Sequence, residues 1–253
     1  MGNPEVRRQS SMTLRLLILA CLTNAVMGLL YVWSLFLLSL EAALGAPRSA
    51  LSLIPALALV TFTLGMMVHD RLLAALRFRA FSLLAFGFAG GGHLLFAFDG
   101  GYAALLTGYG MLFGLGAGLG YGLALALVTR LPTRVRSLGL GLAMAAFAIS
   151  GVVLSGLFAQ PIRETDPTAG FLIIGLAILA AGSGVTAFLP TQPARPMAVQ
   201  ECARPAAKPR RGVRGPTAAP GQPASPDDRN RWTGRSAARC RSARPGVFPE
   251  AYQ

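Results

Sequence analysis

Side chains that could carry out chemistry are few and scattered in this 253-residue sequence. No group of His, Cys, Asp or Glu residues has the spacing of a metal site, and no nucleophile has a base within reach on the same helix face. Only 13% of the residues are charged, which is about half of the roughly 25% that is usual in soluble domains. We therefore expect no catalytic residue, no metal and no cofactor, and an enzyme is the least supported class of function.

Polar residues inside long apolar runs are better candidates for a functional site. Amide, phenol and indole groups need hydrogen-bond partners when apolar residues surround them. They therefore either line a solute pathway or pack within a helix bundle, and the sequence leaves both roles open. We predict that the lining residues of a substrate pathway are Asn24, Tyr31, Trp33 and Tyr121.

Three further side chains in these runs have more ordinary explanations. Tyr102 and Tyr109 follow the start of an apolar run, where tyrosines anchor a helix at the membrane surface, and Tyr102 fits that role better. His93 is the one clear ionisable residue deep inside a run. Such residues are usually functional, but for His93 we favour a hydrogen bond within the bundle over proton transfer.

Six apolar runs are long enough to position these residues across a membrane, because a helical span needs about 20 apolar residues. The runs cover residues 14–40, 51–68, 80–98, 102–129, 138–159 and 169–189. Backbone that faces lipid must satisfy its own hydrogen bonds, so each run should be helical. We predict an all-α membrane protein with a cytoplasmic N-terminus (1–13), a six-helix domain (14–189) and a disordered basic tail (190–253).

The arginines indicate the orientation of the six spans. They gather at the N-terminus, in the connections after the second and fourth runs, and in the tail, and they are sparse in the other three connections. Basic residues favour the cytoplasmic side of a membrane. We therefore expect a multi-pass protein of the cell membrane, such as a bacterial inner membrane, with both termini in the cytoplasm.

Glycines in the fourth run recur at every fourth position. Gly110, Gly114, Gly118 and Gly122 would lie on one helix face, where the missing side chains allow a neighbouring helix to approach closely. A phosphate-binding loop is excluded because no G-x-G-x-x-G pattern and no preceding strand are present. We predict close helix packing for this row, and in a transporter the same face could also slide.

The connection between the second and third runs contains Gly65, the pair Asp70-Arg71, and then Arg77 and Arg79. This pattern resembles the loop signature of the major facilitator superfamily, although the first glycine is one position early and the second is replaced. The resemblance implies the N-terminal six-helix half of such a transporter, in which Asp70 and Arg71 would brace a cytoplasmic helix end and exchange partners between conformations. In the simpler alternative, the arginines mark the cytoplasmic side and Asp70 is their counter-ion.

Residues 28–36, followed by Gly45 and Arg48, and the glycine-rich fourth run resemble the oxalate/formate antiporter-like branch of that superfamily. This resemblance implies transport of a small organic anion such as a carboxylate. A desolvated anion needs a cationic partner, yet no Arg or Lys lies deep in the six runs. In the resembling family this charge comes largely from the second half, and substrate lies between two six-span halves. We therefore expect a missing C-terminal half or a second copy of the chain to close the pathway.

The segment 190–253 differs in composition from the rest of the chain. It holds 12 of the 23 Lys and Arg residues and 11 of the 17 prolines, without apolar periodicity, so it should not fold alone. One interpretation is a basic tail attracted to anionic lipid. We favour a frameshift or truncation in a GC-rich gene, and nucleic-acid binding fits poorly because aromatic residues are few.

These observations predict a secondary active transporter of a small solute that is truncated to its N-terminal half. Its expected partners are the lipid bilayer and the solute, and no nucleic acid. The alternative is a non-transporting remnant of such a half, or a membrane-anchored interaction protein that uses the basic tail.

Overall fold

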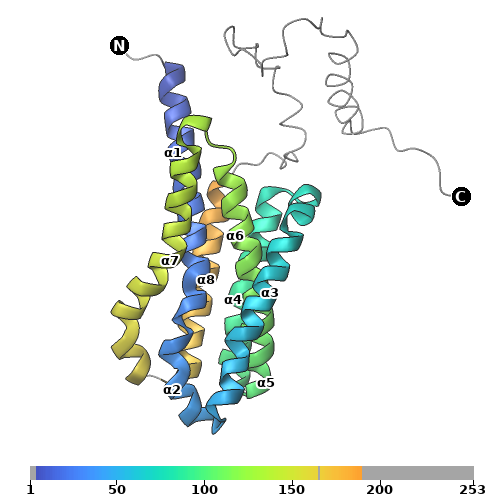
Figure 1. The fold of residues 1–253 in the computed structure, drawn as a ribbon, viewed down its shortest axis with the longest axis vertical. Helices are drawn as coiled ribbons and strands as arrows, with labels where there is room; N and C mark the ends of the chain where they lie inside the picture. Colours follow the sequence, from blue (N-terminus) through green and yellow to red (C-terminus); the bar gives the residue numbers. More distant parts are fainter. Residues whose placement is uncertain (1–3, 165, 190–253) are drawn as a thin grey trace, which may run out of the picture. The chain divides into compact units, whose positions relative to one another are not determined.

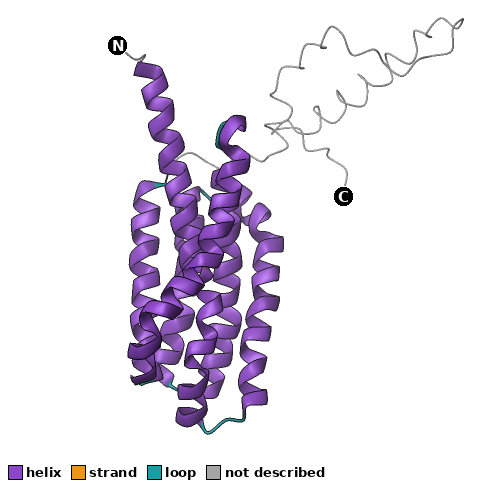
Figure 2. Cartoon of the chain, turned by 60° about the vertical axis from the view of Figure 1, so that its left-hand side comes forward, coloured by secondary structure: helices purple, strands orange, loops and turns teal. Residues whose placement is uncertain are grey.

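The computed structural model describes residues 4–164 and 166–189, and almost all of these residues are helical (Figure 2). The segments follow in the order α1 (Pro4–Met27), η1 (Gly28–Val32), α2 (Trp33–Leu44), α3 (Arg48–Ala75), α4 (Phe78–Asp99), α5 (Tyr102–Leu105), η2 (Leu106–Phe113), α6 (Gly114–Val128), α7 (Thr133–Glu164) and α8 (Pro167–Phe188). Here η1 is a 3-10 helix and η2 is a π-helix, and the other segments are α-helices.

In the part of the chain that the structure describes, six helices are long and apolar enough to cross a membrane. Span 1 runs through α1, η1 and α2, and span 4 through α5, η2 and α6, whereas spans 2, 3, 5 and 6 lie in α3, α4, α7 and α8. The predicted all-α architecture with six candidate transmembrane helices is confirmed, and the chain is a multi-pass membrane protein. Helix α1 begins at Pro4, so it includes most of the predicted N-terminal segment, while the predicted tail lies outside the described residues.

The spans lie side by side along the long axis of the bundle (Figure 1), and spans of the first three pack against spans of the last three. Span 2 packs along span 4, span 5 along span 1, and span 3 along spans 4 and 6, while span 1 contacts span 4. Exchanging spans 1, 2 and 3 for spans 4, 5 and 6 relates the pair 2–4 to the pair 5–1, but the extensive contact between spans 3 and 4 has only a small counterpart between spans 6 and 1. Because spans 1 and 4 run in opposite directions, this partial correspondence is of the kind expected for two inverted three-span repeats.

Spans 1 and 4, which occupy equivalent places in the two repeats, are both interrupted by helix that is not α-helical. Span 1 contains the 3-10 segment Gly28–Val32, and span 4 contains the π segment Leu106–Phe113. Both spans remain helical throughout, as the sequence predicted, and only the helix type changes. At Gly28 the backbone of span 1 approaches span 5 so closely that a Cβ would overlap the carbonyl group of Phe147 and the hydroxyl of Ser150.

The predicted glycine row of span 4 faces span 2 along its length. A Cβ at Gly114 or Gly118 would lie within 3.0 Å of backbone atoms of α3. In a bilayer the surrounding lipid is as apolar as the side chains, so this close van der Waals contact is what holds two helices together. The contacts along α3 are Gly110 with Leu57, Gly114 with Ala58, Gly118 with Phe62, and Gly122 with His69.

Two arginines from different spans hold the last turn of span 6. Arg15 of α1 donates a hydrogen bond of 2.5 Å to the carbonyl oxygen of Phe188. Arg79 of α4 donates hydrogen bonds of 3.3 Å to the carbonyl oxygens of Ala187 and Leu189. The last carbonyl groups of a helix have no partner within the helix and carry partial negative charge. The two guanidinium groups therefore cap span 6 and join spans 1, 3 and 6 at one end of the bundle.

Candidate functional site

Spans 1 and 4 contact each other through their two interruptions. The phenol of Tyr109 in η2 donates a hydrogen bond of 3.1 Å to the carbonyl oxygen of Leu30 in η1. The Tyr109 ring is buried, and its centre lies 5.0 Å from the centre of the Trp33 ring. A change of helix type disturbs the regular backbone hydrogen bonds, and inside a membrane only protein groups can replace them. Tyr109 therefore donates a hydrogen bond inside the bundle. Its position in the sequence had suggested a different role, that of an anchor at the membrane surface.

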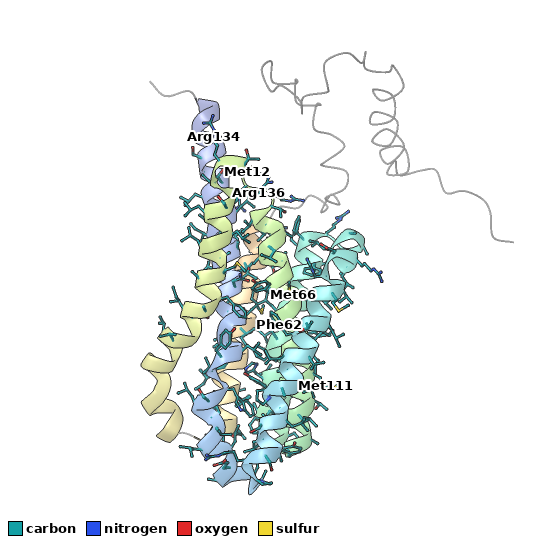
Figure 3. The ribbon with its side chains drawn as sticks, in the orientation of Figure 1. Met12, Phe62, Met66, Met111, Arg134 and Arg136 are labelled. Atoms are coloured by element: carbon teal, nitrogen blue, oxygen red, sulfur yellow. The ribbon has the colours of Figure 1, made fainter. Side chains whose placement is uncertain are left out.

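Four aromatic side chains, one from each of spans 1, 2, 4 and 5, form a cluster that we call the aromatic face: Tyr31, Phe62, Tyr121 and Phe147. The centre of the Phe147 ring lies 5.5 Å from that of Tyr31, 6.0 Å from that of Phe62 and 5.2 Å from that of Tyr121. These distances are typical of edge-to-face and tilted ring contacts. Phe62 lies midway along α3, so the cluster is near the middle of the bundle (Figure 3).

The hydroxyl groups distinguish the aromatic face from the other tyrosines in the spans. Tyr102 donates to the carbonyl oxygen of Ala50 and Tyr109 to that of Leu30. The hydroxyls of Tyr31 and Tyr121 have no hydrogen-bond partner among the residues that the structure describes. A phenol hydroxyl without a partner is costly in hydrocarbon. The aromatic face therefore suits a polar or hydrated surrounding better than contact with lipid tails.

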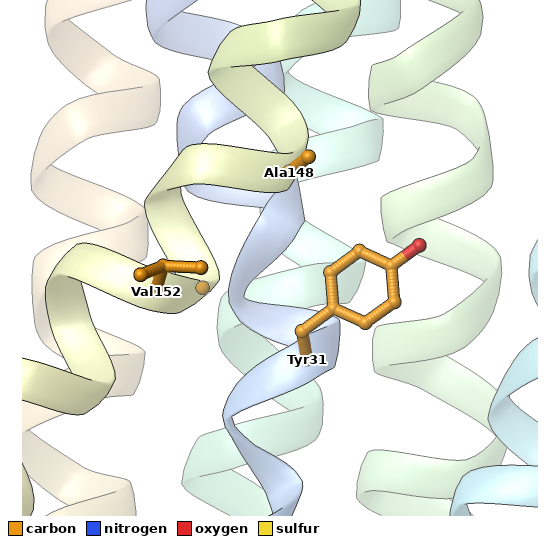
Figure 4. A pocket seen from close by; sticks show the side chains of 4 residues that line it. Tyr31, Ala148 and Val152 are labelled. Carbon is orange, nitrogen blue, oxygen red and sulfur yellow. The ribbon is translucent and has the colours of Figure 1, made fainter.

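An open pocket of about 510 Å³ lies beside the aromatic face (Figure 4). It is lined by Tyr31 of span 1 and by Ala148, Gly151 and Val152 of span 5. Figure 1 shows α7 turning away from the neighbouring helices beyond its middle, which opens this side of span 1. A Cβ at Gly151 would lie 2.8 Å from the Cβ of Tyr31, so the glycine allows spans 1 and 5 to approach closely at this point.

The four predicted lining residues divide into two groups. Tyr31 is 58% exposed and Tyr121 is half-buried, and both belong to the aromatic face. Asn24 and Trp33 lie inside the bundle, where Asn24 donates a hydrogen bond of 2.9 Å to the carbonyl oxygen of Ala143. The Asn24 Oδ1 atom is buried without a partner among the described residues. The structure thus brings two of the four together, and a pathway role stays a prediction for all of them.

His93 lies in the aromatic core between spans 3, 4 and 6. Its Nδ1 atom is 3.0 Å from the carbonyl oxygen of Ala89, and its ring centre is 4.5 Å from that of Phe113 and 5.4 Å from that of Phe171. The side chain is buried and bonded within its own helix, as favoured from the sequence. Within residues 4–164 and 166–189, no three His, Cys, Asp or Glu side chains are placed to hold a metal ion.

The loop motif, which consists of Gly65, Asp70, Arg71, Arg77 and Arg79, combines one packing residue with several surface residues. Gly65 is buried against span 4, where a Cβ would lie 2.6 Å from the carbonyl oxygen of Leu115. The carboxylate of Asp70 lies 3.2 Å from Nε2 of His69, the residue that also packs on the glycine row. The exposed members of the motif are Asp70, Arg71, Arg77 and Arg79. Of these, Arg79 caps span 6, and the bracing role of Asp70 and Arg71 stays a prediction.

Two members of the aromatic face were missed from the sequence. Phe62 and Phe147 stand in apolar runs that contain many other phenylalanines, so their residue type gives no signal. The structure places the backbone of Phe62 against Gly118 of span 4 and its ring 5.7 Å from that of Tyr121, a pairing that no spacing within either run indicates.

The six spans, the paired interruptions and the aromatic face define a multi-pass α-helical membrane protein that presents unpaired phenols on one side of its bundle. In comparisons with protein-family models and with curated proteins, nothing matches this chain.

Proposed function

We propose that this chain forms one six-span half of a secondary active transporter for a small solute, of the major facilitator type. The observation that carries the proposal is the contact between the two interrupted spans through the Tyr109–Leu30 hydrogen bond. In transporters, irregular helix in the first span of each repeat points to a binding site near mid-membrane. Here such segments occupy spans 1 and 4, the first span of each repeat.

The packing of the spans supports the same class. Transporters of this type bind solute between bundles built from inverted repeats, and they expose the site alternately by rocking one bundle against another. In this chain, spans 1, 2, 4 and 5 each contribute one ring to the aromatic face, while spans 3 and 6 pack behind spans 1 and 4. Such a face, built by spans 1 and 2 together with spans 4 and 5, is suited to form one wall of a solute pathway.

A pathway that is enclosed on both sides requires a second wall opposite the aromatic face. A second copy of this chain or a separate six-span half would supply it. Tyr31 is 58% exposed and the neighbouring pocket is open, so the aromatic face is accessible to such a partner. The loop motif with Asp70 and Arg71 would then lie at one end of the bundle, where charges can exchange partners during rocking.

Uptake by the full chain in liposomes tests this proposal. Purified protein is reconstituted, the liposomes are loaded with an unlabelled solute, and accumulation of the same labelled solute is measured by counterflow. The panel contains carboxylates (oxalate and formate), an amine (choline) and a neutral polyol (glycerol). We expect accumulation of at least one class above protein-free liposomes, and slower accumulation by Tyr109→Phe.

A matched control is Phe98→Leu, which changes an exposed ring that lies outside the aromatic face. This variant should transport at the rate of the unchanged protein. If the folded protein accumulates no class of solute, the transport proposal is wrong. The chain would then be a non-transporting six-span unit, such as a remnant or a membrane-anchored interaction protein.

A further inference from the structure

We infer that the aromatic face binds a small organic cation, such as a quaternary ammonium compound, as the solute of this site. The inference rests on the proposed function, because it names the substrate class of the same face. It differs from the organic anion that the sequence resemblance implied. Three properties of the described residues carry it, namely the charge near the face, the arrangement of the rings and the unpaired phenols.

The charge around the aromatic face does not suit an anion. The described basic residues of the four spans that form the face lie near span ends, as Arg15, Arg48 and Arg71 do. His69 packs against Gly122, one residue from Tyr121, and its ring faces the carboxylate of Asp70 at 3.2 Å. A desolvated carboxylate would find no cationic partner on this face.

The rings themselves offer the opposite electrostatic character. The faces of phenylalanine and tyrosine rings carry partial negative charge, and cations are attracted to them within about 6 Å of a ring centre. Phe147 is buried and packs against the rings of Tyr31, Phe62 and Tyr121 at 5.2 to 6.0 Å, which leaves the exposed Tyr31 and the half-buried Tyr121 as the rings that a ligand can reach. Accessible aromatic rings are the usual recognition element for quaternary ammonium groups.

The two unpaired hydroxyls and the pocket complete the site. The phenol oxygens of Tyr31 and Tyr121 can accept a hydrogen bond from an ammonium or from the hydroxyl of a ligand. The adjoining pocket of about 510 Å³ is open to the surroundings, and Tyr31 is the member of the aromatic face that lines it. Its lining residues Ala148 and Val152 are apolar and suit the methyl groups of a quaternary ammonium.

Direct binding of labelled choline to the purified full chain tests this inference without requiring transport. The detergent must carry no choline headgroup, because that headgroup would compete for the site. The competitors are tetramethylammonium, oxalate, and 3,3-dimethylbutan-1-ol, which has the shape of choline without its charge. We expect displacement by tetramethylammonium, and at least about tenfold weaker displacement by the neutral alcohol, since the alcohol cannot make a cation–π contact.

Variants of Tyr31 assign the binding to the aromatic face. Because Tyr31 is 58% exposed, its replacement should leave the fold intact. Tyr31→Phe keeps the ring and should bind choline within about threefold of the unchanged protein, whereas Tyr31→Leu should bind about tenfold more weakly. Phe98→Leu, with an exposed ring elsewhere, should bind normally.

Each outcome separates this inference from the proposed function. Equal displacement by choline and its neutral analogue, displacement by oxalate, or no choline binding by folded protein would overturn the cation site. Uptake of another solute in that case would leave the transport proposal standing. Choline binding without uptake of any solute would support the cation site and contradict transport.

Discussion

At the scale of single residues, the four tyrosines of the described spans have two different environments. Tyr102 and Tyr109 each donate a hydrogen bond to a carbonyl group of another span, while Tyr31 and Tyr121 share a surface with phenylalanines and have no such partner. A partner for a buried phenol stabilises the bundle, and an unpaired phenol on a surface is available to a ligand. Residue type alone could not separate these two pairs.

The hydrogen bond of Tyr109 can be tested by Tyr109→Phe. The change leaves the ring in place and removes the donor to the Leu30 carbonyl oxygen. We expect a loss of about 1 kcal/mol in the free energy of unfolding, measured by titration with SDS in mixed micelles. Tyr102→Phe removes a similar bond near the end of span 4 and should leave solute counterflow unchanged. Equal counterflow by Tyr109→Phe and the unchanged protein would show that the contact between the interruptions plays no part in transport.

At the scale of the helices, hydropathy predicted the number of spans but not their internal irregularities. The run around Gly28 is apolar on both sides, and a 3-10 turn and an α-helix are equally compatible with such a pattern. The 3-10 segment begins where Gly28 lies in close contact with Phe147 and Ser150 of span 5, more than a hundred residues away in the chain. The glycine row, in contrast, was predictable because glycine spacing alone determines a helix face.

The close contact between spans 2 and 4 leads to a prediction for Gly118→Ala. The added methyl group would overlap the backbone of Phe62 and push the two helices apart. We expect a loss of about 1–3 kcal/mol in the free energy of unfolding, again measured by SDS titration. The matched control is Gly87→Ala in α4, where a Cβ meets no atom within 4 Å, and there stability should be unchanged or slightly higher. Equal stability of the two variants would contradict the packing role of the row.

The loop motif leads to a prediction for Asp70→Asn. Asp70 is exposed and faces His69, so the change should leave the folded bundle intact. If its charge takes part in exchange of partners between conformations, counterflow should fall several-fold while choline binding is retained. Arg71→Gln should have a similar effect. Unchanged counterflow in Asp70→Asn would rule out the bracing role and leave Asp70 as a local counter-ion of the neighbouring arginines.

At the scale of the whole molecule, the aromatic face leads to a prediction about assembly. If a second copy of the chain forms the other wall, cysteines on this face should come close across the two copies. We expect oxidation to cross-link Ala148→Cys in a chain whose native Cys21, Cys202 and Cys240 are replaced by serine. Leu176→Cys lies on the exposed surface of span 6 and should not cross-link. Cross-linking at residue 176 alone would place the dimer contact on the opposite side.

The sequence and the structure agree best where one local property decides the outcome. Span number follows from hydropathy, and close packing of span 4 follows from glycine spacing. The aromatic face depends on four residues that are brought together only by the packing of spans 1, 2, 4 and 5, so Tyr31 and Tyr121 could be suspected from their type but Phe62 and Phe147 could not. Trp33 looked similar to Tyr31 in the sequence, yet it lies two residues further along the helix and points into the bundle.

The central claim is that the aromatic face borders a hydrated solute pathway rather than lipid, and cysteine accessibility tests it most directly. In the serine-substituted chain described above, Tyr31→Cys and Leu83→Cys are treated in native membranes with a charged, membrane-impermeant thiol reagent. Both native side chains are 58% exposed, and Leu83 lies on span 3, away from the aromatic face. We expect rapid labelling at residue 31 and none at residue 83. Labelling of neither residue, with both reacting only with a membrane-soluble maleimide, would contradict it and place the aromatic face in the lipid.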